Sequence, residues 1–263
     1  MATPNLTCLE AVGRCQDRAD NRIAPVRLGV LAFGDSITNA GGDLQWGVAL
    51  HSWALWTARA LGLAYTGYAT DGARVDDVRD RQIPAFEARA AHPDARYDVG
   101  CLYIGVNDVR GLAWDPGAFA AGYEPCLSFL AARCDRVLTL TAPLGLGVPP
   151  ARTKVADLNA VIRSTAATAG ALVVDLSDFG ARNHVMADRV HPTAFGQIAI
   201  AERALGVLAR DGLVAPVAPA SLISYRTTRV GRLRGDMTYV YRGAKVRARG
   251  AVMRWRLKRG LGS

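Results

Sequence analysis

Short apolar runs alternate along the chain with longer segments in which apolar residues recur every three to four positions. The run 26–33 is short and rich in branched residues, which is typical of a buried strand, whereas 46–61 has the apolar spacing of a helix. The alternation continues to residue 212, and we expect Pro84 to interrupt the helical segment 73–91. Further strands are predicted at 62–70, 97–106, 136–143 and 171–177, and further helices at 115–133, 151–170 and 192–212.

This alternation predicts an α/β fold, a three-layer α/β/α sandwich with a mostly parallel five-stranded sheet. Ligands of such sheets bind beyond the carboxyl ends of the strands, so the loops that follow the strands are where chemistry is expected. We expect residues 26–213 to form this unit after an N-terminal segment, 1–25. A Pro/Ala-rich linker at 214–220 and a basic C-terminal extension at 221–263 are predicted to follow.

Composition indicates a globular protein, because 50% of the residues are hydrophobic and no uninterrupted apolar run is long enough to span a membrane. The first residues lack a basic stretch followed by an apolar one, so we expect no secretory signal. The five cysteines are odd in number and lack the paired spacing of a zinc site. Together these features favour a reducing cytoplasm.

The net charge of +9 is unevenly distributed. Residues 221–263 hold 12 Lys or Arg and one acid, Asp236, which leaves the first 220 residues at −2. As a helix, this extension places Met237, Val240 and Tyr241 on one apolar face flanked by cations; alternatively, 237–242 and 244–249 could pair as strands. It is interpreted as a solvated extension, or as a peripheral anchor on an anionic membrane at the inner surface. Nucleic acid is the least favoured partner, because no recognition motif accompanies the charge.

One serine stands directly after the first predicted strand, within the sequence GDSIT at 34–38. At a strand-to-helix turn, backbone N–H groups and the helix dipole favour negative charge. At this position Ser36 could act as a nucleophile whose reaction forms an oxyanion. It could equally well be an ordinary helix N-cap. The rest of the chain must therefore decide its role.

Further polar clusters follow other predicted strands and should meet Ser36 at one edge of the sheet. Gly72 follows the second strand, Asn107 follows the third, and Asp188 and His191 precede the last helix. Acyl transfer needs a serine, an imidazole to take its proton, an acceptor to orient that imidazole, and donors for the oxyanion. Ser36, His191 and Asp188 could fill the first three roles, and the backbone N–H groups of Ser36 and Gly72 with the Asn107 amide could fill the last.

Each of these residues also has an ordinary structural interpretation. His191 could simply start a helix, Asp188 could lie on the surface while a carbonyl orients the imidazole, and Gly72 and Asn107 could only shape turns. Asp35 and Asp108 are expected to be structural, bonding the backbone of neighbouring loops. The remaining histidines, His51, His92 and His184, lack a partner at useful spacing. His184 nevertheless lies close enough in sequence to the loop of His191 to be a candidate for contact with a substrate.

The blocks GDSIT, Gly72, GVND (105–108) and DRVH (188–191), in this order, resemble the SGNH/GDSL hydrolase family over roughly residues 26–212. The block around Gly72 departs most from the family pattern. The resemblance implies a flavodoxin-like fold, with Ser36 as nucleophile, His191 as base and Asp188 orienting it. It also implies Gly72 and Asn107 as oxyanion partners, and no metal or organic cofactor.

We therefore predict a serine hydrolase of the esterase or lipase type that cleaves a small-molecule carboxylic ester through an acyl-enzyme. An acyltransferase using the same acyl-enzyme is the alternative within catalysis. A catalytically silent protein that reaches a membrane or nucleic acid through its basic extension is the alternative of another class.

Overall fold

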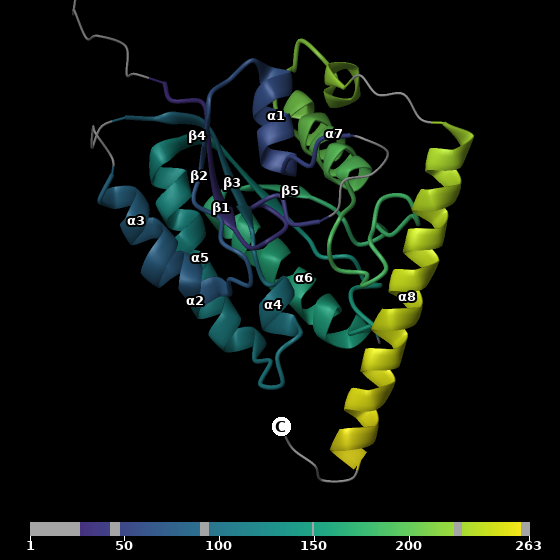
Figure 1. The fold of residues 1–263 in the computed structure, drawn as a ribbon. Coiled ribbons are helices and arrows are strands. Elements are labelled where there is room, and N and C mark those ends of the chain that lie inside the picture. The colour runs from purple at the N-terminus through teal and green to yellow at the C-terminus, as the bar shows by residue number, and fades with distance from the viewer. Residues whose placement is uncertain (1–26, 43–47, 90–94, 149, 224–227, 259–263) are drawn as a thin grey trace, which may run out of the picture.

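The computed structural model describes residues 27–42, 48–89, 95–148, 150–223 and 228–258, with side chains described through residue 252. Five parallel strands form one sheet in the order β2-β1-β3-β4-β5 (Figure 1). This is the flavodoxin-like order, so the predicted fold class is confirmed. The strands are β1 (Val30–Gly34), β2 (Tyr65–Gly67), β3 (Tyr97–Tyr103), β4 (Cys134–Leu140) and β5 (Leu172–Val174).

Helices cover both faces of the sheet and complete the three layers (Figure 1). Two of them, α1 and α7, pack against each other on one face, and α5 and α6 pack together on the other. Capping residues mark the ends of several of these helices. The Asp115 side chain accepts backbone N–H groups at the start of α5, and Gly170 ends α6 in a left-handed conformation. The bounds are α1 (Trp53–Leu61), α4 (Val106–Val109), α5 (Pro116–Arg133), α6 (Arg152–Ala169) and α7 (Ala194–Arg210).

The central strands carry the core and fix the edge where the strands end. Every residue of β1 is buried, and the ring of Phe33 packs against Tyr68, Phe86 and Phe129. Burial on both faces explains why this strand is continuously apolar rather than alternating. Cys101, Cys126 and Cys134 are free and buried, consistent with small core residues. Cys8 and Cys15 lie outside the described residues.

The first helix begins later than the periodicity predicts. We expect a helix over 46–61, but α1 begins at Trp53 and Ser52 is its N-cap, with the Leu55 N–H donating to the Ser52 hydroxyl at 3.2 Å. Residues 43–47 lie outside the described part of the chain. The N-cap interpretation of Ser36 is therefore wrong for this helix, because Ser52 performs that role.

Pro84 does not interrupt the second helical stretch, contrary to our expectation. The segments α2 (Val75–Asp77), η1 (Val78–Gln82) and α3 (Ile83–Glu87) follow one another without a gap, and η1 is π-helical. The Ile83 N–H donates to the Val78 carbonyl across this wider turn. Pro84 then lies in the first turn of α3, a position at which the fixed φ of proline suits a helix.

The basic extension forms one long helix, α8 (Arg229–Lys258), rather than paired strands. Figure 1 shows α8 running beside the loops that precede α7. The predicted linker includes part of a 3-10 helix, η2 (Pro219–Leu222), in which Pro219 is buried. Since η2 contacts α1 and α7, the chain remains against the α/β unit at least to Ile223.

Candidate active site

Ser36 lies directly beyond the carboxyl end of β1 and is half-buried. Its hydroxyl Oγ is 2.9 Å from Nε2 of His191, 155 positions along the chain. The chain turns sharply after Ser36, and a Cβ on Gly41 would lie only 2.6 Å from the Ser36 carbonyl. Glycine is required there because the backbone passes so close to the serine.

His191 is held on its other side by Asp188, as the spacing of DRVH predicts. Nδ1 of His191 is 2.7 Å from Oδ2 of Asp188, while Oδ1 accepts the backbone N–H groups of Val190 and His191 at 2.9 and 3.1 Å. The hydrogen bond with Asp188 raises the pKa of His191 above its usual value, against the opposing effect of burial. Burial acts to raise the pKa of Asp188, but the hydrogen bonds from His191 and Val190 outweigh it and hold that pKa below its usual range. The pair therefore favours an imidazole that accepts a proton at Nε2.

Gly72 and Asn107 lie at the same cleft. Gly72 adopts a left-handed conformation with φ of 75°, and Asn107 donates from Nδ2 to the carbonyl of the adjacent Ala73 at 2.9 Å. This bond fixes the orientation of the Asn107 amide and leaves its second Nδ2 hydrogen for another acceptor. The cleft has a volume of about 410 Å³ and is lined by Ser36, Gly41, Gly42, Asp71, Gly72, Asn107, Met186 and His191. The structure thus brings together all five residues singled out from the sequence.

Asp108 bonds the backbone of a neighbouring segment, as predicted, whereas Asp35 bonds the backbone of its own turn. The Asp35 carboxylate accepts the Ile37 N–H at 2.9 Å, and Asp108 accepts the Val75 N–H at 3.1 Å. Burial raises the pKa of Asp35 to about 7 and also raises the pKa of Asp108. One oxygen of each carboxylate is buried without a hydrogen-bond partner in the described structure, so their protonation is linked to folding.

Two buried glutamines that the sequence analysis did not single out bracket Ser36. Gln82, in the π-helical segment, accepts the Gly34 N–H at 3.0 Å and donates to the Gly34 carbonyl at 2.8 Å. Gln197 donates to the Ile37 carbonyl at 2.9 Å and accepts the Trp53 N–H at 2.7 Å. These amides hold the backbone on both sides of the serine. Gln197 could have been found from the sequence, because it is a polar residue on the otherwise apolar face of a helix.

The remaining histidines do not join this site. His51 packs edge-on against Trp56, and His184 stacks on Phe179, and neither lines the cleft. Burial lowers the pKa of both imidazoles. His92 lies outside the described residues.

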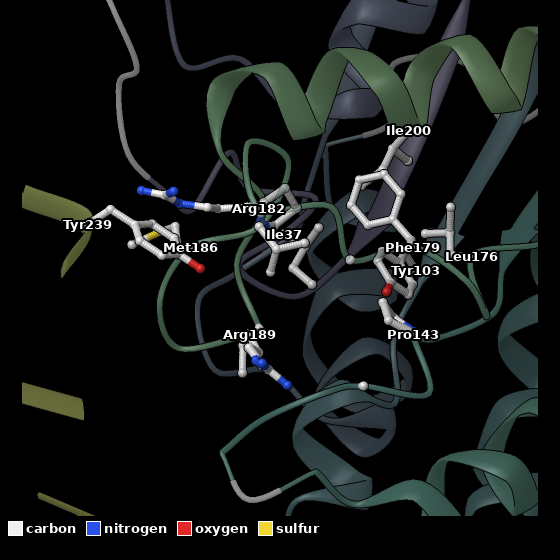
Figure 2. A pocket seen from close by; sticks show the side chains of 15 residues that line it. Ile37, Tyr103, Pro143, Leu176, Phe179, Arg182, Met186, Arg189, Ile200 and Tyr239 are labelled. Carbon is white, nitrogen blue, oxygen red and sulfur yellow. The ribbon is translucent and has the colours of Figure 1, made fainter. Parts of the chain in front are cut away.

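A separate, mostly apolar cavity of about 280 Å³ lies behind the loop that carries His191. Figure 2 shows Leu176, Phe179 and Tyr103 gathered at one end and Met186 with Tyr239 of α8 at the other. Met186 lines both this cavity and the catalytic cleft. None of the residues singled out for chemistry lines the cavity, so it belongs to the packing of the loop rather than to the reacting centre.

The described residues include no cluster of three or more His, Cys, Asp or Glu side chains placed to hold a metal ion. Among the same residues, no helix is both long enough and apolar enough to cross a membrane. The cleft itself brings together a hydroxyl, an imidazole and nearby amide donors.

Comparisons with known proteins agree with the fold and give the family. The GDSL-like Lipase/Acylhydrolase family matches residues 32–198. Among solved structures, Axe2, an acetylxylan esterase from Geobacillus stearothermophilus, is similar at 19% identity, with a TM-score of 0.56 over 73% of this chain and 99% of that chain. LAE5, an α/β hydrolase enzyme from the metagenome of Lake Arreo, Spain, is 20% identical, with a TM-score of 0.55 over 71% of this chain and 97% of that chain. No curated protein matches the chain.

Proposed function

Because the chain belongs to the GDSL-like lipase/acylhydrolase family and is an ester hydrolase, we propose that it cleaves small-molecule carboxylic esters through an acyl-enzyme on Ser36. One observation carries the proposal. The hydroxyl of Ser36, the imidazole of His191 and the carboxylate of Asp188 form a continuous hydrogen-bonded series, with heavy-atom distances of 2.9 and 2.7 Å, that opens into a cleft. This series supplies an activated nucleophile, which is the element that ester cleavage requires of the protein.

In the first half of the reaction, Oγ of Ser36 attacks the acyl carbonyl while Nε2 of His191 takes the hydroxyl proton. The carbonyl oxygen becomes an oxyanion, which the N–H groups of Ser36 and Gly72 and the amide of Asn107 stabilise. Asp188 stabilises the imidazolium that forms. Collapse of the tetrahedral intermediate breaks the bond to the alcohol, and His191 returns the proton to the departing oxygen.

In the second half, water attacks the acyl group on Ser36 and gives its proton to His191. The acid is released when the second tetrahedral intermediate collapses and the proton returns to Ser36. Acyl transfer to another acceptor differs only in which hydroxyl attacks the acyl-enzyme. The name of Axe2 makes acetyl esters the first substrates to try.

The proposal is tested by hydrolysis of p-nitrophenyl acetate and by mass spectrometry of protein quenched during turnover. We expect the native protein to gain one acetyl group on Ser36, and Ser36→Ala to lose both the adduct and turnover. Ser164→Ala is the matched control, because its hydroxyl is exposed and bonds only within α6. Equal turnover by Ser36→Ala and Ser164→Ala would remove Ser36 from the mechanism.

Association with an anionic membrane surface through residues 221–263 is a second proposal, favoured by the outer face of α8. Six apolar side chains of this helix are more than half exposed. Helical spacing places them on one side, with Arg and Lys on both flanks, an arrangement typical of helices that lie in a membrane interface. The six are Val230, Leu233, Met237, Val240, Tyr241 and Val252.

This second proposal predicts co-sedimentation of the native protein with vesicles that contain anionic lipid. Met237→Glu with Tyr241→Glu should reduce that binding, whereas turnover of a soluble ester should stay unchanged because neither residue lines the catalytic cleft. Binding equal to that of the native protein in this double variant would contradict the proposal.

A further inference from the structure

A groove of about 850 Å³ separates α8 from the loop that carries the catalytic histidine. One wall is α8, and the other consists of residues shortly after Ser36 and immediately before the last helix of the α/β unit. Along α8, Arg242, Lys245 and Arg249 recur at intervals of three and four residues, so they share one side of the helix, and Arg234 lines the same groove two turns earlier.

The groove meets the catalytic cleft on the side of the histidine. Gly42 and Met186 line both spaces, and Asp188 and Thr193 flank His191 within the groove wall. The oxyanion donors proposed above do not line the groove. Since the departing alcohol oxygen must lie within reach of Nε2 of His191, the alcohol portion of an ester extends toward this groove.

Among the described residues, the lining of the groove holds more cations than acids. Among the residues that the structure describes, the side chains of Arg234, Lys245 and Arg249 have no acidic partner. Asp188 is the acid among the described residues of the lining, and its carboxylate is engaged by His191 and by two backbone N–H groups. The acid of α8, Asp236, is paired with Arg182 at 3.0 Å and does not line the groove.

We propose that this groove binds an anionic group, a carboxylate or a phosphate, carried by the alcohol portion of the ester substrate. The inference rests on the proposed ester hydrolysis and adds to it the substrate's charge. Several cations on one wall, beside a cleft with little opposing charge, raise the local concentration of an anion and favour its hydrogen bonding to guanidinium and ammonium groups. Salt should weaken this binding by screening.

The test uses three acetyl esters with a common aryl skeleton. 4-Acetoxybenzoate and 4-acetoxyphenyl phosphate carry the anion on the alcohol side, and 4-acetoxybenzamide is the neutral counterpart. We expect Lys245→Glu with Arg249→Glu to lower kcat/KM for the anionic esters by about tenfold or more, mainly through KM, with less than about a twofold change for the amide.

Arg232→Glu with Arg247→Glu is the matched control, because it makes the same change in net charge on the same helix and neither residue lines the groove. This control should leave the preference for the anionic esters unchanged. An equal loss in both double variants would assign the effect to overall charge and overturn the groove as a site. An unchanged preference in Lys245→Glu with Arg249→Glu would also overturn it.

Binding of the unreactive amides 4-acetamidobenzoate and 4-acetamidobenzamide, measured by calorimetry, separates this inference from the proposed reaction. Tighter binding of the carboxylate, lost in Lys245→Glu with Arg249→Glu, supports the groove even for a protein that hydrolyses none of the esters. Turnover of the neutral ester with equal binding of the two amides supports the reaction and overturns the groove.

Discussion

The α/β unit and α8 differ in charge and in where their apolar side chains lie. The unit has a near-neutral sequence around a buried apolar core, whereas α8 is strongly basic and exposes six of its apolar side chains to solvent. The unit holds its reacting groups with hydrogen bonds of defined geometry, and α8 contacts it through an exposed ion pair, Asp236 with Arg182, and the stacking of Arg182 on Tyr239. We therefore expect the chemistry to lie in the α/β unit, while α8 presents charge and apolar surface beside it.

Within the α/β unit, we expect His191→Ala to have the largest effect on turnover. Loss of the base should lower kcat for p-nitrophenyl acetate by about 10⁴-fold. The His191 side chain is 29% exposed and is held by a loop, so the free energy of unfolding should change by less than about 1 kcal/mol. Steady-state kinetics and urea unfolding measure the two quantities. Near-native turnover by the variant would show that another group acts as the base. Unfolding of the variant would show that His191 supports the fold.

Asn107→Ala should have the next largest effect on the reaction. Removing an oxyanion donor typically lowers kcat by about 10²- to 10³-fold, and KM should change little because the donor acts on the developing charge. Asn183→Ala, at an exposed position outside the cleft, is the control. A large rise in KM with kcat unchanged would make Asn107 a residue of ground-state binding.

Gln197→Leu tests how strongly the backbone around Ser36 depends on buried amides. The variant leaves the Trp53 N–H and the Ile37 carbonyl without their present partner, so the free energy of unfolding should fall by about 2–4 kcal/mol. Glu202→Leu, at an exposed position on the same helix, should change stability by less than about 0.5 kcal/mol. Equal stabilities of the two variants in urea unfolding would show that the buried amide does not hold this backbone.

A change of pH should have a smaller and graded effect on kcat/KM. Protonated His191 cannot accept the Ser36 proton, so kcat/KM should fall about tenfold per pH unit below the pKa of His191. The hydrogen bond with Asp188 raises that pKa above 6.5, which places the midpoint of the profile above pH 6.5. Asp188→Asn removes the stabilisation of the imidazolium and should move the midpoint to lower pH. An identical midpoint in this variant would contradict the role of Asp188.

Arg182→Ala should have the smallest effect, because it removes an exposed contact between α8 and the unit. Exposed ion pairs contribute little, so the free energy of unfolding should fall by less than about 1 kcal/mol and turnover of a soluble ester should remain native. Thermal unfolding and steady-state kinetics measure both. A fall of several kcal/mol in the free energy of unfolding would show that α8 is an integral part of the fold. The two regions could then no longer be treated as distinct.

Sequence alone predicted the features that depend on local pattern. The apolar run of β1, the alternation that follows it and the helix end at Gly170 are encoded within a few residues of where they act. Parallel strands also end at a common edge, so Ser36, Asn107 and the loop of His191 could be expected to meet without knowledge of the strand order.

Only the tertiary structure decided features that depend on partners distant in sequence. The two glutamines that bracket Ser36 bond to Gly34 and Ile37, 48 and 160 positions away, and the Trp53 N–H at the start of α1 donates to Gln197, 144 positions away. The same holds for α8. Its sequence is compatible with a helix or with paired strands, and the face that a helix presents to solvent depends on what packs against its other side. Local sequence sets which elements can form, whereas long-range packing and hydrogen bonding select among them, because burial is a property of the whole fold.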